Sequence, residues 1–85
     1  MYLVYVLKSV RDNKVYTGCT TNLQKRIAEH NEGRQFSTKY RAPFELIYSE
    51  WCQSKDDAFQ REAYLKSGAG KKYIHSRLKH YFAVG

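Results

Sequence analysis

Short apolar runs separated by polar breaks predict strands joined by turns in the first half of the chain. Residues from Tyr2 to Lys8 and from Lys14 to Cys19 are rich in β-branched and aromatic side chains. The segment from Arg11 to Asn13 between them has turn-forming composition, so the pattern predicts a β-hairpin with a loop longer than two residues. The alternation from Phe44 to Trp51 predicts a third strand.

The first predicted helix follows the hairpin directly. Thr20 to Asn22 supplies candidate N-caps, the helix runs to about Asn31, and Gly33 ends it. Leu23 and Ile27 lie four residues apart and are therefore expected to form its buried stripe.

Two further helices are predicted after the third strand. Ser54 and Asp57 have the spacing of a capping box, which opens a helix over Lys55 to Ser67. The segment from Gly68 to Gly70 is expected to break it, and a last helix is predicted over about Lys71 to Tyr81. Its inward face is expected to consist of Ile74, Leu78 and Tyr81.

The order ββαβαα predicts an α+β fold, with a small three-stranded antiparallel sheet flanked by helices. A length of 85 residues leaves room for one hydrophobic core, so we expect a single domain over residues 1–85, with its core over about 2–82. The longest apolar run, Tyr2 to Leu7, is far shorter than the ~20 residues of a membrane span. With no signal peptide before the first strand, and with Cys19 and Cys52 read as reduced thiols, we expect a cytoplasmic protein without a membrane partner.

The charge of the chain is positive and unevenly distributed. There are 15 Lys and Arg residues against 8 Asp and Glu residues, and no acidic residue follows Glu62. Arg34 to Pro43 is polar and basic and is expected to be an exposed loop. A basic domain with eight tyrosines suits a polyanion such as nucleic acid, although a basic surface without a binding role remains the alternative.

Glu62 interrupts the apolar face of the second predicted helix. On a helical wheel Ala58, Phe59, Ala63 and Leu65 define an apolar arc, and Glu62 falls inside it. A carboxylate that faces a core is costly unless it is paired or binds a metal. Glu62 is therefore either one partner of a buried ion pair, or a metal ligand or acid-base group in a cleft.

Four further side chains are candidates for chemistry on phosphate. Arg26 and His30 lie one helical turn apart beside the buried stripe of the first helix, and the planar charge of Arg26 suits a phosphate. Tyr5 and Tyr16 lie in the hairpin, where a phenol passes a proton if a nearby cation lowers its pKa. The alternatives are solvated side chains for the first pair and core packing for the tyrosines.

Leu3-Val4-Tyr5, Tyr16-Thr17-Gly18 and the helix segment Leu23 to Asn31 occur in this order, and Arg61-Glu62 follows on a later helix. Together these segments resemble the GIY-YIG nuclease family. The likeness covers essentially the whole chain and looks strongest for the small stand-alone bacterial members.

The resemblance implies a role for each candidate residue. Tyr5 and Tyr16 match the tyrosines of the two motif halves, and Arg26 matches the helix arginine that contacts the scissile phosphate. His30 matches a histidine one turn later, and Glu62 matches the carboxylate that holds a single divalent cation, Mg²⁺ or Mn²⁺. The implied activity is metal-dependent hydrolysis of phosphodiester bonds in nucleic acid, with DNA expected first and with weak sequence preference.

Substrate phosphates are expected to contact five basic side chains: Lys25, Lys39, Arg41, Lys71 and Lys72. The chain departs from the family pattern at Leu3 and Thr17, and it has no asparagine after Asn31, where many active relatives carry one. Two alternatives therefore stay open. One is a nucleic-acid-binding module of the same fold that cleaves poorly, and the other is a domain that depends on a protein partner or on a homodimer.

Overall fold

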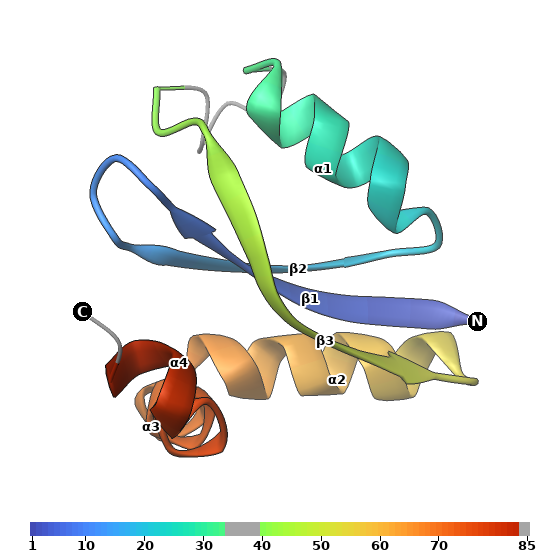
Figure 1. The fold of residues 1–85 in the computed structure, drawn as a ribbon. Helices are drawn as coiled ribbons and strands as arrows, with labels where there is room; N and C mark the ends of the chain where they lie inside the picture. The colour runs from blue at the N-terminus through green and yellow to red at the C-terminus, as the bar shows by residue number, and fades with distance from the viewer. Residues whose placement is uncertain (34–39, 84–85) are drawn as a thin grey trace.

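The computed structural model describes residues 1–33 and 40–83 (Figure 1). Three strands, β1 (Tyr2–Ser9), β2 (Val15–Thr20) and β3 (Phe44–Cys52), form one antiparallel sheet in the order β2-β1-β3. The helices are α1 (Leu23–Asn31), α2 (Lys55–Lys66), α3 (Gly68–Arg77) and α4 (Lys79–Ala83). The predicted α+β fold is confirmed, with the last predicted helix divided into α3 and the short α4.

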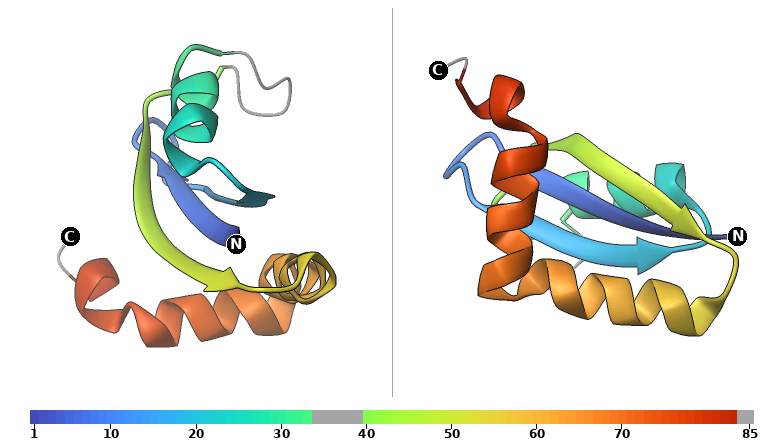
Figure 2. Two further views of the ribbon diagram at one scale, coloured as in Figure 1. Left: turned by 90° about the vertical axis from the view of Figure 1, so that its right-hand side faces the viewer. Right: turned by 90° about the horizontal axis from the view of Figure 1, so that it is seen from below.

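Helices cover both faces of the sheet (Figures 1 and 2): α1 lies on one face, and α2 and α3 lie on the other. Because β1 is the central strand, its side chains are buried on alternating faces. Val4 and Val6 pack against α2 and α3, whereas Tyr5 and Leu7 pack on the α1 side.

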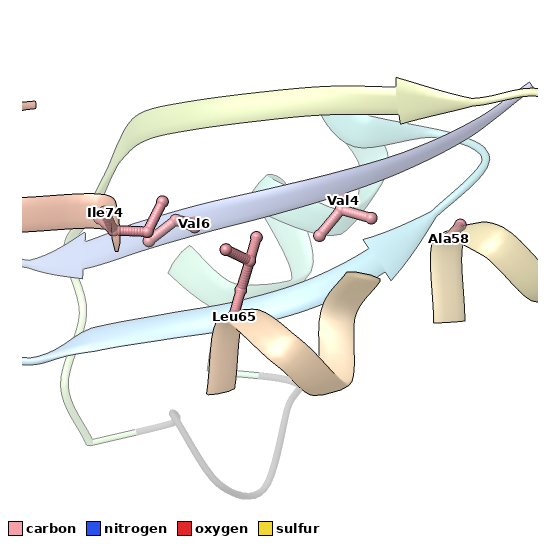
Figure 3. Close-up of a cluster of buried hydrophobic side chains, with 5 residues drawn as sticks. All are labelled: Val4, Val6, Ala58, Leu65 and Ile74. Carbon is pink, nitrogen blue, oxygen red and sulfur yellow. The ribbon is translucent and has the colours of Figure 1, made fainter. Parts of the chain in front are cut away.

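Each face therefore has its own hydrophobic cluster. Figure 3 shows the one between the sheet and the C-terminal helices, formed by Val4, Val6, Ala58, Leu65 and Ile74. The cluster on the α1 side is built on Tyr5, Leu7 and Phe44, with Leu23 and Ile27 packed against it. The stripe predicted for the first helix is thereby confirmed.

The beginning of α1 agrees with the predicted cap. The Oδ1 atom of Asn22 accepts a hydrogen bond from the backbone N–H of Lys25 at 3.1 Å. This bond satisfies one of the free N–H groups of the first turn and fixes where α1 leaves the end of β2.

The prediction that Gly68 to Gly70 form a break between two helices, with the last helix starting at about Lys71, is wrong. Helix α3 already begins at Gly68, because the Ser67 hydroxyl caps it by accepting the Gly70 N–H at 3.1 Å. A side chain at position 70 would place its Cβ 1.9 Å from the Tyr64 carbonyl oxygen. Glycine is therefore needed for the close approach of α3 to the end of α2.

Two details of the α2 prediction are also corrected. Ser54 is the N-cap residue by position, but its side chain makes no capping hydrogen bond within the described residues, so no capping box forms. Phe59 is 49% exposed and Ala63 is exposed as well, so the buried stripe is narrower than the predicted arc. It consists of Ala58 and Leu65, two turns apart.

The C-terminal part of the chain packs inward mainly through aliphatic side chains. Ile74 is buried and Leu78 packs against the same cluster, as predicted. Tyr81 is only half-buried, and its hydroxyl donates a hydrogen bond to the carboxylate of Glu45. Neither cysteine forms a disulfide, and no helix in the described ranges is long and apolar enough to cross a membrane.

Candidate active site

Tyr5 lies directly across Gly18 of the neighbouring strand. The register of β1 and β2 pairs these two residues. A Cβ atom at position 18 would lie 2.3 Å from the Tyr5 hydroxyl oxygen and 2.4 Å from its Cζ atom. The absent side chain therefore lets the buried ring, only 4% exposed, lie over β2 with its hydroxyl toward that edge strand.

The Tyr5 hydroxyl is hydrogen-bonded to His30. The distance between Oη and the Nε2 atom of His30 is 3.1 Å, and His30 is 7% exposed in the last turn of α1. The imidazole also packs edge-on against the ring of Phe44, with centroids 5.7 Å apart. The Phe44 backbone N–H donates to the Oδ1 atom of Asn31 at 2.7 Å, which ties the end of α1 to β3.

Burial sets the protonation states of this pair. It raises the pKa of Tyr5 to about 12; the charge of Arg26 opposes this shift, and that of Glu62 reinforces it. Burial also lowers the pKa of His30 below its usual 6.5, and Arg26 lowers it further. At neutral pH the phenol is therefore protonated and the imidazole is neutral, so the Tyr5 hydroxyl can donate to Nε2.

Arg26 lies on α1 one turn before His30 and at the rim of a surface cleft. The cleft has a volume of about 340 Å³ and is lined by residues 20–22 together with Lys25, Arg26 and Glu29. The Arg26 side chain is 36% exposed, and its Nε atom lies 3.5 Å from Oε1 of Glu29. This pair restrains the guanidinium on the helix but leaves it accessible to an anion from solvent.

Glu62 approaches Tyr5 from the other side of the sheet. Its side chain is 21% exposed, and its Oε2 atom pairs with Nζ of Lys66 one turn later on α2, at 3.0 Å. The expected apolar arc around Glu62 is wrong, because Phe59 and Ala63 are exposed, and the expected ion pair forms with an exposed lysine and not with a buried one. Helix α2 packs against β2 and β1, and the charge of Glu62 acts on both Tyr5 and Cys19.

Tyr16 lies on the same side of the sheet as Tyr5, but it takes no part in the hydrogen bond between Tyr5 and His30. Its ring packs edge-on against Phe44, with centroids 5.4 Å apart. In the described part of the chain, the Tyr16 hydroxyl makes no hydrogen bond to another residue. The geometry brings together Tyr5, His30 and the charges of Arg26 and Glu62, and the catalytic role of Tyr16 stays a prediction.

A comparison with known families agrees with this arrangement. The model of the GIY-YIG catalytic domain matches residues 1–82. The chain belongs to the GIY-YIG domain family.

Similar proteins of this family occur in bacteria and archaea. A UPF0213 protein of Staphylococcus haemolyticus is 45% identical over 67 residues, which are 78% of this chain and 80% of the relative. A UPF0213 protein of Natronomonas pharaonis is 47% identical over 68 residues, 78% of each chain. The solution NMR structure of a UPF0213 protein from Bacillus halodurans has a TM-score of 0.56 at 33% identity and covers 92% of this chain and 86% of that one.

Glu62 is a single carboxylate and not one of several side chains that surround a metal ion. Within the described residues, no group of three or more His, Cys, Asp and Glu side chains is arranged to hold a metal ion. A Mg²⁺ ion in a phosphate-processing site usually takes one or two carboxylates and completes its shell with water and substrate oxygens. A half-buried Glu62 fits that kind of cation, and it does not fit a structural metal.

The basic residues predicted to contact substrate are spread over three parts of the GIY-YIG domain. Lys25 is exposed beside Arg26, and Lys71 and Lys72 are exposed on α3. Arg41 is exposed, but its guanidinium already donates to the Oδ2 atom of Asp12 at 2.8 Å. The fifth residue, Lys39, lies outside the described residues.

An ion pair that sequence reasoning missed holds α2 against the sheet. The Arg61 side chain donates from Nε to Oε1 of Glu50 on β3, and its second bond to the same carboxylate is 3.5 Å long. The guanidinium also lies over the rings of Tyr64 and Tyr73, at 5.0 and 4.8 Å from the centroids. Because Arg61 precedes Glu62, this pair helps to fix the helix that carries the carboxylate.

Proposed function

We propose that this GIY-YIG domain is a divalent-metal-dependent nuclease that hydrolyses phosphodiester bonds in nucleic acid, with DNA as the expected substrate. The observation that carries the proposal is the buried hydrogen bond between Tyr5 and His30, whose phenol is under the influence of both Arg26 and Glu62. Family membership and the combination of a proton-transfer pair, a guanidinium and a carboxylate support this reaction class.

The Tyr5–His30 pair activates the attacking water. With a pKa of about 12, Tyr5 keeps its proton at neutral pH and is not a base by itself. The neutral His30 accepts that proton at Nε2 while the Tyr5 oxygen takes a proton from water. The charge of Glu29, which raises the pKa of His30, then helps to stabilise the imidazolium that results.

Arg26 stabilises the negative charge that develops on the phosphate. Its planar guanidinium presents parallel N–H donors that match two phosphate oxygens. The Glu29 carboxylate orients it from the next turn of α1. Loss of one such electrostatic stabiliser lowers turnover by about 10²-fold or more.

Glu62 is the residue that would hold the cation, Mg²⁺ or Mn²⁺. When bound, the cation supplies Lewis-acid chemistry at a phosphate oxygen. To hold a cation, Glu62 would give up its contact with Lys66, whose exposed ammonium group would move into solvent at little cost.

The basic side chains add affinity without sequence readout. Lys25, Lys71 and Lys72 are exposed cations on helices and suit phosphate contacts, and the sequence predicts the same role for Lys39 and Arg41. A domain of this size with such contacts has weak sequence preference and binding that weakens steeply with salt.

The Tyr5→Phe variant tests the proposal because it removes only the hydroxyl. We expect the single-turnover cleavage rate to fall by about 10²-fold or more, in the range of lost acid-base catalysis, while DNA binding in EDTA is unchanged. Tyr64→Phe, which removes a hydroxyl from a more exposed tyrosine on α2, is the matched control and should cleave normally. Equal rates for Tyr5→Phe and wild type would refute the proposed role of the pair.

A further inference from the structure

A second cleft opens at the beginning of β2, away from the Arg26 cleft. Its volume is about 450 Å³, and it is lined by residues 13–16 of the hairpin, by Lys71 and His75 of α3, and by Phe82 of α4. Three separate parts of the chain therefore contribute to one cavity. Figure 2 shows α3 crossing below the strands of the sheet.

Two of the side chains that line this cleft are lysines. Lys14 and Lys71 come from different elements, and His75 lies one turn after Lys71. None of the described lining residues is acidic, and within the described ranges neither lysine forms an ion pair. Two ammonium groups beside one cavity repel each other, so an anion bound between them is favoured.

The remaining wall of the cleft is apolar and ordered. Val15 and Tyr16 line it from β2, and Phe82 lines it from α4. The ring of His75 stacks on that of Phe82, with centroids 4.2 Å apart and planes at 31°. Cationic groups above an aromatic wall suit a nucleotide, which combines a phosphate with an apolar sugar and base.

The position of the cleft relates it to the candidate active site. Tyr16 lines the cleft and also packs in the cluster that contains Tyr5. Lys14 directly precedes β2, the strand that carries Gly18 opposite Tyr5, so the cleft lies at the start of the strand that runs past the Tyr5 ring.

We propose that this cleft binds a backbone phosphate of the nucleic-acid substrate, away from the scissile phosphate, through Lys14 and Lys71. The proposal rests on the proposed nuclease function and adds a second, non-catalytic contact point to it. A nucleic-acid strand that reaches both the cleft and the active site has a minimum length. It must extend on the side of the scissile bond that faces the cleft.

The first test measures binding of fluorescent single-stranded DNA in EDTA, where no cleavage interferes. Loss of the phosphate contact in Lys14→Ala/Lys71→Ala should reduce the slope of log affinity against log salt by about 0.7. The affinity lost between 50 and 200 mM salt then becomes about 2.6-fold smaller than for wild type. The control Lys55→Ala/Lys79→Ala removes the same charge from exposed lysines outside the cleft and should keep the wild-type slope.

The second test replaces one phosphate at a time with a neutral methylphosphonate. At one position outside the scissile phosphate, the substitution should weaken binding to wild type and leave binding to Lys14→Ala/Lys71→Ala unchanged. A double variant with the wild-type salt slope, or a wild-type protein that does not bind DNA, would overturn the proposal. Cleavage by wild type is measured separately with Mg²⁺, so its absence would refute the nuclease assignment without affecting the binding result.

Discussion

Replacing Gly18 with alanine is the sharpest perturbation that the site offers, because it adds one methyl group beneath the ring of Tyr5. The new Cβ atom would lie 2.3 Å from the Tyr5 hydroxyl oxygen, whereas ordinary contacts begin at 3.4 Å. The ring must therefore move by about 1.1 Å or more. It is buried and bonded to His30, so this movement breaks or lengthens the 3.1 Å hydrogen bond.

Two effects of different size follow from Gly18→Ala. Overpacking a buried site costs about 1–3 kcal/mol, which leaves most domains folded at 25 °C, given typical stabilities of about 5–15 kcal/mol. A displacement of about 1 Å in a reacting group lowers the rate by about 10²-fold. We therefore expect a folded protein with moderately reduced stability and a cleavage rate about a hundredfold below that of wild type.

Two other glycines provide controls of the same chemistry. Gly68→Ala places its Cβ with no atom within 4 Å, so it should not lower stability and should leave cleavage unchanged. Gly70→Ala forces its Cβ against the Tyr64 carbonyl oxygen, so it should lower stability and leave the rate per folded molecule unchanged. The assay is single-turnover cleavage beside urea denaturation. A Gly18→Ala protein that cleaves within threefold of wild type would refute this reasoning.

Three further predictions concern charged groups. Because burial lowers the pKa of His30, the cleavage rate measured between about pH 5 and 8 should fall on the acid side with a midpoint below 6.5, and His30→Gln should lack that step. Lys66→Met should lower the Mg²⁺ concentration for half-maximal cleavage by about 1.4- to fivefold, since an exposed pair with Glu62 is worth about 0.2–1 kcal/mol. Glu50→Gln should lower the free energy of unfolding by about 1–3 kcal/mol in urea. Burial raises the Glu50 pKa, but the hydrogen bonds from Arg61 and Tyr48 and the charge of Arg61 together outweigh it and hold that pKa below 4.5, so the variant should also lack the loss of stability that wild type shows as pH falls below 4.5.

The fold followed from local patterns wherever those patterns agree with the tertiary structure. Alternation along β1 and the turn composition after it predict the hairpin, and the Leu23 and Ile27 spacing predicts the inward face of α1. The start of α3 was not predictable by the same rules, because glycine disfavours a helix on its own. The Ser67 cap and the close contact of Gly70 with α2 outweigh that preference, and the second of these is a tertiary feature.

The sequence predicted less of the candidate site than of the fold. Tyr5 and His30 are 25 residues apart, and only the strand register with the docking of α1 brings their polar atoms together. Glu62 was singled out by an apolar arc that does not exist, since Phe59 in that arc is exposed. Its effect on Tyr5 depends on how α2 packs beside β2, which the helix pattern does not contain.

The central claim is that this domain cleaves DNA with Arg26 and Glu62, and one measurement tests it most directly. Wild type, Arg26→Ala and Glu62→Gln are compared on plasmid, single-stranded and branched DNA with Mg²⁺, Mn²⁺ or EDTA, with binding measured in parallel. We predict metal-dependent cleavage by wild type, no cleavage in EDTA, and rates lower by about 10²-fold or more in both variants, which still bind DNA. Salt-sensitive binding without cleavage of any substrate would contradict the claim and indicate a binding module, and cleavage that survives both substitutions would contradict the assigned site.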